Sequence, residues 1–174
     1  MPTMDTESET MRTGNHALYD ITAEEFVCGC ILIDPTKAAA ACYQVTNRAD
    51  FCDPNLAELF DVLCLVAITG KTNLYDFGAL WEMLKREKNT ISHETLTRAF
   101  IAAGKLPHAS NAIYYAERIA RLSKLRRLAL AISSASGAID SDADPVEIAG
   151  RLESIGFRQT NRRFPCKRFP LGMR

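Results

Sequence analysis

The fold is decided near the N-terminus by the stretch TAEEFVCGCILIDP, which spans Thr22–Pro35. Thr22, followed three positions later by Glu25, predicts a capping box, in which each side chain accepts a hydrogen bond from a backbone N–H at the other's position. Apolar residues then recur at helical spacing and predict one buried helix face, made of Phe26, Val27, Cys30 and Ile31.

Two small residues set the packing of this predicted helix, and a proline sets its end. Gly29 and Cys30 are small enough to let a neighbouring helix approach closely. Pro35 predicts that the helix ends near Ile33, because proline disfavours helical geometry at the residue before it.

Further helix signals follow along the rest of the chain. Aspartate followed by proline predicts a cap and a first helical position in Asp34-Pro35, Asp53-Pro54 and Asp144-Pro145. Other capping residues are Asp76 and Ser92, and the predicted helix ends are Gly70 and Gly104. Since no stretch alternates long enough to predict a strand, we expect an all-α fold: a compact helical bundle of seven or eight helices that closes in a C-terminal helical hairpin.

The longest periodic stretch runs over about residues 112–139 and predicts the first helix of that hairpin. It combines leucines with basic residues, which suits a protein interface because arginine is enriched there. The other interpretation is that these leucines belong to the core and the charges only solvate the outer face. The candidate interface residues are Arg118, Arg121, Leu122, Lys124, Leu125, Arg127 and Leu128.

Length and composition indicate an ordinary globular protein. The chain has 174 residues, of which 47% are hydrophobic and 24% charged, so it can bury a core of its own. We divide it into a disordered leader at 1–20, a helical domain at 21–157 with the hairpin at about 112–157, and a basic tail at 158–174. No apolar run is long enough for a membrane span, and the acidic N-terminus does not resemble a signal peptide. We therefore expect a cytoplasmic protein.

Charge is unevenly distributed although the formal net charge is zero. Residues 1–157 hold 15 basic and 21 acidic residues, whereas the tail has no acidic residue. Such a tail can attract DNA weakly or an acidic partner, and the other interpretation is a solvated chain end. The basic residues of the tail are Arg158, Arg162, Arg163, Lys167, Arg168 and Arg174.

The sequence shows no arrangement that predicts catalysis, a cofactor site or a metal site. The six cysteines lack a second pair at zinc-like spacing, so we expect buried, reduced thiols. The stretch 69–72 resembles the end of a phosphate-binding loop, but Leu65 stands where that loop needs glycine. Glu24 and Glu25 are expected at an exposed helix start, where they complement the helix dipole.

The order of these motifs resembles the N-terminal domain of DnaB-type bacterial replicative DNA helicases. The opening helix, Ala23–Asp34, is similar to the family's Ala-Glu-Gln start followed by an apolar run that ends in Asp. The later landmarks are Phe51, Leu56, Phe60 and Leu63, then the turn Gly70–Asp76 before Leu80, and the closing hairpin at Tyr115–Leu130 and Asp144–Phe157. The resemblance runs from about residue 21 to 157. Glu25 replaces the usual Gln, and Cys28 and Cys30 replace aliphatic or small residues.

This resemblance implies a non-catalytic scaffold that acts in DNA replication. In the family, N-terminal domains self-associate through their hairpins into a collar on a hexameric ring, and the collar docks primase or a helicase loader. The chain ends where the family's linker helix and ATP-hydrolysing motor begin, so a stand-alone module and a fragment of a helicase both stay open. The alternatives are a nucleic-acid-binding accessory protein and a motor-less regulator that joins a full-length replicative helicase.

Overall fold

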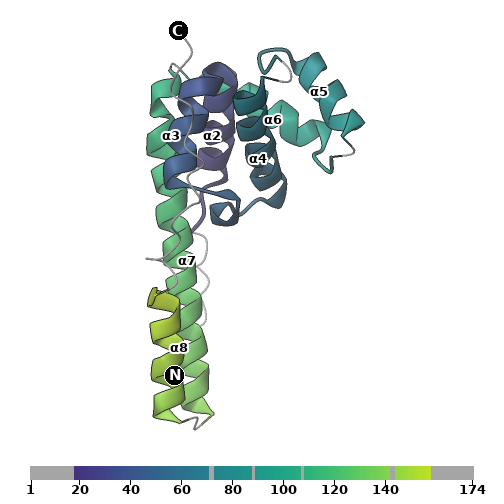
Figure 1. Ribbon diagram of the computed structural model, residues 1–174. Helices are drawn as coiled ribbons and strands as arrows, with labels where there is room; N and C mark the ends of the chain where they lie inside the picture. Colours follow the sequence, from purple (N-terminus) through teal and green to yellow (C-terminus); the bar gives the residue numbers. More distant parts are fainter. Residues whose placement is uncertain (1–17, 71–72, 88, 107, 142–143, 158–174) are drawn as a thin grey trace, which may run out of the picture. The chain divides into compact units, whose positions relative to one another are not determined.

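The computed structural model describes residues 18–157, except 71–72, 88, 107 and 142–143 (Figure 1). Within these residues every regular element is a helix, which confirms the all-α expectation. The α-helices are α2 (Ile21–Ile33), α3 (Pro35–Val45), α4 (Pro54–Thr69), α5 (Phe77–Arg86), α6 (His93–Lys105), α7 (Ala112–Asp140) and α8 (Pro145–Phe157). Two short 3-10 helices, η1 (Arg48–Asp50) and η2 (Ala109–Asn111), connect them.

The chain divides into two compact units, Met1–Leu125 and Arg126–Arg174. The first unit holds α2 to α6 and the N-terminal part of α7, and the second holds the C-terminal part of α7 together with α8. The single domain expected over residues 21–157 stays a prediction. Among the described residues, no helix combines the length and the apolar character that a membrane span requires.

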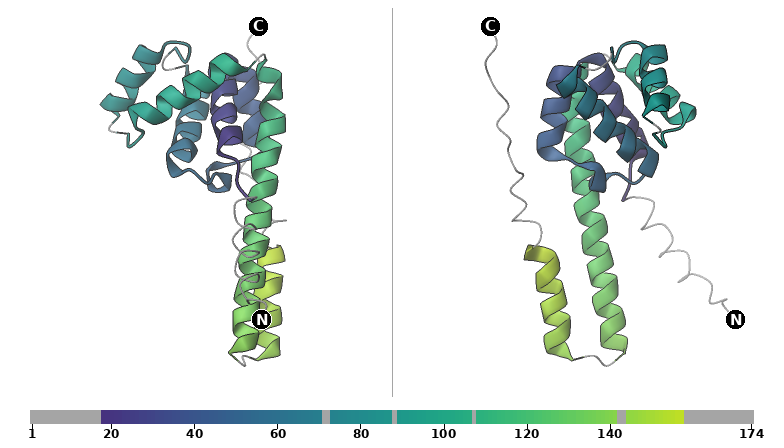
Figure 2. Two further views of the ribbon diagram at one scale, coloured as in Figure 1. Left: turned by 180° about the vertical axis from the view of Figure 1, so that it is seen from behind. Right: turned by 45° about the vertical axis from the view of Figure 1, so that its right-hand side comes forward.

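Helix α2 is the central element of the first unit, and α3, α4 and α6 pack around it (Figures 1 and 2). The expected face is buried at Val27, Cys30 and Ile31, whereas Phe26 is only half-buried. Cys28 and Leu32, which lie off that face, are buried as well. Because three helices surround α2, its burial extends well beyond the single face that the spacing predicted.

Gly29 lets α6 approach α2 as closely as the sequence predicted. A Cβ atom placed on Gly29 would lie 2.8 Å from the backbone nitrogen of Ala103 and 3.1 Å from its Cα atom. Real Cβ atoms essentially never come that close to another heavy atom. The two helix backbones therefore meet at Gly29, and a side chain there cannot be accommodated without moving one of them.

Most of the predicted helix boundaries are confirmed. The side chains of Asp34, Asp53, Asp76 and Ser92 accept hydrogen bonds from backbone N–H groups in the first turns of α3, α4, α5 and α6. Gly70 ends α4 with φ of 63°, in the left-handed region that glycine adopts without strain. This assigns Gly70 to helix termination, the ordinary role that the sequence favoured over a phosphate-binding loop.

Two predicted boundaries were wrong. Helix α2 is capped by Asp20, whose Oδ1 atom accepts from the backbone N–H of Ala23 at 2.9 Å, so Thr22 lies inside the helix and the capping box is absent. Asp20 and Thr22 both carry a side-chain oxygen that can cap a helix, so the spacing of residues could not show which of the two begins α2. Helix α6 continues past Gly104 to Lys105.

In the second unit, α8 runs antiparallel to the C-terminal part of α7, as expected for a helical hairpin (Figures 1 and 2). Asp144 lies just before α8, and its carboxylate accepts from the backbone N–H of Val146 at 2.8 Å. This is the cap that the Asp-Pro pair predicted.

Candidate protein-interaction surface

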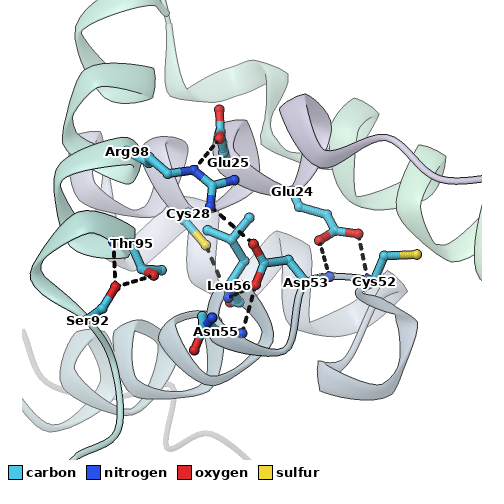
Figure 3. Close-up of polar contacts among 10 residues, drawn as sticks. All are labelled: Glu24, Glu25, Cys28, Cys52, Asp53, Asn55, Leu56, Ser92, Thr95 and Arg98. Carbon is cyan, nitrogen blue, oxygen red and sulfur yellow. Dashed lines mark hydrogen bonds and ion pairs between the residues drawn. The ribbon is translucent and has the colours of Figure 1, made fainter.

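A polar cluster connects α2, α4 and α6 in the first unit (Figure 3). Glu24 is its most buried carboxylate, with only 1% of the residue exposed. Its two oxygens accept from the backbone N–H groups of Cys52 at 2.7 Å and Asp53 at 3.0 Å. The expectation that Glu24 sits on an exposed helix start is therefore wrong, because the segment before α4 folds over it.

Arg98 on α6 completes this cluster. Its guanidinium donates to Glu25 at 2.7 Å and to Asp53 at 3.2 Å, and the hydrogen bond with Glu25 is the main cause that raises the pKa of Arg98. The other oxygen of Asp53 caps α4 by accepting from the backbone N–H groups of Asn55 and Leu56. Each of these carboxylates is committed to a donor within the fold, so the cluster holds three helices together.

The cysteine thiols in the described residues support the core. Cys28, Cys30, Cys42 and Cys64 are free and buried, as expected, while Cys52 is half-buried and Cys166 lies outside the described residues. Burial raises the pKa of Cys30 to about 11 and that of Cys42 to about 12. In the part of the chain that the structure describes, no group of His, Cys, Asp or Glu is arranged to hold a metal ion.

The candidate interface residues of the first unit lie on the N-terminal part of α7. Arg118 forms an ion pair with Asp20, and this hydrogen bond raises its pKa, so the guanidinium is tied to the start of α2. Arg121 and Lys124 are exposed, Leu122 is half-buried and Leu125 is 38% exposed. Of the two interpretations of the leucines, a core position suits Leu122 better and a surface position suits Leu125.

The candidate residues of the second unit, Arg127 and Leu128, are exposed on the C-terminal part of α7. Leu128 retains 53% of its accessible surface. The structure adds further exposed apolar side chains that the interface prediction did not include: Leu130, Ile132, Ile139, Val146 and Leu152. The available signal was that apolar residues continue past Leu128 through both helices of the hairpin.

We call the exposed apolar residues of the second unit the hairpin surface: Leu128, Leu130, Ile132, Ile139, Val146 and Leu152. Val146 and Ile139 are 77% and 65% exposed, which leaves most of each side chain in water. Contiguous exposed apolar patches mark interaction sites, and helical spacing places Leu128, Ile132 and Ile139 on one side of α7, whereas Leu130 lies on another side. The basic residues expected to form a nucleic-acid-binding tail, from Arg158 on, lie outside the described residues.

Comparisons with known proteins agree with the all-α fold. The family model described as the DnaB-like helicase N terminal domain matches residues 16–121. Among solved structures, the chain is similar to the N-terminal domain of DnaB helicase from Mycobacterium tuberculosis, with a TM-score of 0.65 and 22% identity. That similarity covers 80% of this chain and 97% of the other and shows a shared fold. No curated protein matches the chain.

Proposed function

Since this chain belongs to the DnaB-like helicase N-terminal domain family, we propose that it is a non-catalytic assembly module of a replicative DNA helicase. It self-associates through its hairpin and presents a docking site for primase or a helicase loader, in the cytoplasm. If the chain is a fragment of a complete helicase, ATP hydrolysis and unwinding belong to the motor domain of that parent, because the family match concerns the N-terminal domain.

The observation that carries this proposal is the hairpin surface. It places six large apolar side chains in water on two adjacent helices. Burial of one such side chain contributes about 1.5–3 kcal/mol, whereas a micromolar dimer has a binding free energy of about 8 kcal/mol. Burying several of them against a second hairpin therefore offers enough apolar area to offset the entropy lost on association.

Light scattering coupled to size-exclusion chromatography tests the surface. The variant with Leu128→Lys and Ile132→Lys puts two charges into the proposed contact and is expected to shift the protein to monomer at concentrations where the wild type is oligomeric. Leu65→Lys is the matched control, because Leu65 is 51% exposed on α4 of the first unit. A double variant that associates like the control would contradict self-association through the hairpin.

Docking of primase or a loader is supported by the family membership, and it has a separate test. Purified bacterial primase immobilised on a sensor surface is expected to bind the wild-type chain. No binding at high micromolar concentration would refute primase docking while leaving self-association intact.

A motor-less regulator would use the same hairpin surface against a full-length replicative helicase. Mixing the chain with an intact helicase of this family distinguishes the two roles. Co-elution with the helicase and a changed unwinding rate would favour the regulator, and an unchanged helicase would favour the assembly module.

A further inference from the structure

We propose that a groove on the first unit docks an amphipathic helix of a partner protein, one that carries acidic residues beside its large apolar ones. The groove has a volume of about 680 Å³. Three segments line it: the junction of α2 and α3, the turn before α5, and η2 with the first turn of α7. Every lining residue belongs to the described part of the first unit, so the groove is separate from the hairpin surface. The inference goes beyond the proposed function and requires neither self-association nor primase docking.

The deep part of the groove is lined by small side chains. Ala38 and Ala41 stand three positions apart on one side of α3, and Ala112 begins α7. Ala38 and Ala112 are buried and Ala41 is half-buried. Large apolar side chains stand in water at the edges, since Tyr75 is 64% exposed and Ile113 is 43% exposed. A hollow lined by methyl groups between exposed large residues can receive a large apolar side chain of a partner.

The walls of the groove are held in place by contacts within the first unit. The thiol of Cys42 on α3 donates to the backbone carbonyl of Ala112 at 3.6 Å, and η2 packs against α2. Tyr75 is held in a turn, because Oδ1 of Asn73 accepts from its backbone N–H at 3.0 Å. The groove therefore exists before a partner binds, which lowers the entropy lost on docking.

The charge and the donors at the rim favour an acidic partner. The side chain of Lys37 is 88% exposed, and its ammonium lies 3.9 Å from Asp34, at the outer limit of an ion pair. Asp34 is committed to the start of α3, where its carboxylate accepts from the backbone N–H of Lys37 at 3.1 Å. His108 and Ser110 are exposed, and the imidazole of His108 makes no capping hydrogen bond to η2. An ammonium, an imidazole and a hydroxyl can each donate to a carboxylate of the partner.

The form of the partner follows from the helical walls. An extended peptide binds by adding to a sheet edge, and the described residues contain no strand. A proline-rich peptide needs a groove lined by several aromatic rings, whereas Tyr75 is the only Phe, Tyr or Trp among the described residues that line this groove. An amphipathic helix inserts apolar side chains at i, i+3 or i+4, and i+7 between helices. Helix docking is therefore the mode that this groove suits.

Selection from a phage-displayed library tests the groove, with the full chain as target and helical peptides of about 18 residues, or five turns, as probes. We expect the enriched peptides to carry aspartate or glutamate beside large apolar residues at helical spacing. Synthetic copies are then titrated into the isotope-labelled full chain. NMR shift changes should map to the lining residues of the groove, among them Ala41 and Ile113.

Two variants of the full chain alter the groove in different ways. Ala41→Phe fills the hollow and should weaken peptide binding by about tenfold or more. Lys37→Glu reverses the rim charge and should weaken it by about fivefold at low salt and by less at high salt. Because Lys37 is 88% exposed, this second variant should fold even if Ala41→Phe disturbs α3. Arg86→Glu is the matched control, since Arg86 is exposed on α5 and does not line the groove, and it should bind like the wild type.

The outcomes separate this inference from the proposed function. The selected peptides should bind the Leu128→Lys, Ile132→Lys variant as tightly as the wild type, so a failure of self-association leaves the inference standing. Peptides that bind Lys37→Glu and Ala41→Phe as tightly as the wild type overturn it, and so does a selection that enriches no peptide. Enriched peptides without acidic residues also contradict it. Shift changes at the groove with duplex DNA, and none with any peptide, would assign the groove to nucleic acid instead.

Discussion

Replacing Gly29 by alanine should destabilise the first unit, although alanine is the better helix former. In an open helix position, glycine to alanine is worth about 1 kcal/mol in favour of alanine. Here the added Cβ atom would lie 2.8 Å from the backbone nitrogen of Ala103, and backbone cannot rotate aside as a side chain can. Forcing extra volume into a packed core costs about 1–3 kcal/mol.

Because the contacted atoms belong to the backbone, we expect a packing cost near the upper end of that range. The helix preference of alanine offsets about 1 kcal/mol of this cost, so Gly29→Ala should lower the free energy of unfolding by about 1–2 kcal/mol. Gly104→Ala is the control, because a Cβ atom at Gly104 in α6 meets nothing within 4 Å. It should leave stability unchanged or raise it by up to about 1 kcal/mol. Urea unfolding followed by circular dichroism measures both. A Gly29→Ala protein as stable as its Gly104→Ala counterpart would refute the close approach of α6 to α2.

Three further predictions concern polar and titrating groups. Glu24→Gln should lower the free energy of unfolding, measured with urea, by about 1–3 kcal/mol. The wild-type carboxylate accepts from two backbone N–H groups, whereas the amide of glutamine would point its NH₂ donor at one of them. Stability equal to that of the wild type would show that the carboxylate is not needed. Asp20→Ala should lower the free energy of unfolding by about 1 kcal/mol, because α2 loses its cap. Asp20→Asn keeps the capping acceptor and should lower it by less, although it loses the ion pair with Arg118. An asparagine variant that melts at a lower temperature than the alanine variant would argue against capping. Burial raises the pKa of Cys30 to about 11 and of Cys42 to about 12, above that of an unfolded thiol, about 8.5. The stability that these thiols contribute is therefore complete below about pH 8.5 and is lost as pH rises toward the folded values, so unfolding free energy should fall over that window; a constant value there would contradict burial of the thiols.

The parts of the fold that the sequence predicted well depend on neighbours along the chain. The Asp-Pro pairs at Asp34 and Asp53 begin helices because the cap and the first helical position are adjacent residues. Gly70 ends α4 for an equally local reason, since its own backbone conformation closes the helix. Gly29 was predicted only in part. Its small size predicted that another helix comes close, but only the tertiary structure shows that this helix is α6.

The parts that the sequence did not predict depend on segments far apart in the chain. Glu24 is buried because the backbone of residues 52–53 donates to it, and no spacing within α2 indicates that contact. Arg98 meets Glu25 from 73 positions away for the same reason. The interface prediction ended at Leu128, whereas exposed apolar residues continue along the hairpin to Leu152, and exposure of this kind depends on which neighbours cover each side chain.

Sedimentation equilibrium of the intact chain, from low to high micromolar concentration, tests the central claim that the apolar hairpin is an association surface. The account predicts a mass that rises with concentration in the wild type and in Leu65→Lys, and stays that of one chain when Leu128 and Ile132 are both lysine. A wild-type mass equal to one chain over the whole range would contradict it.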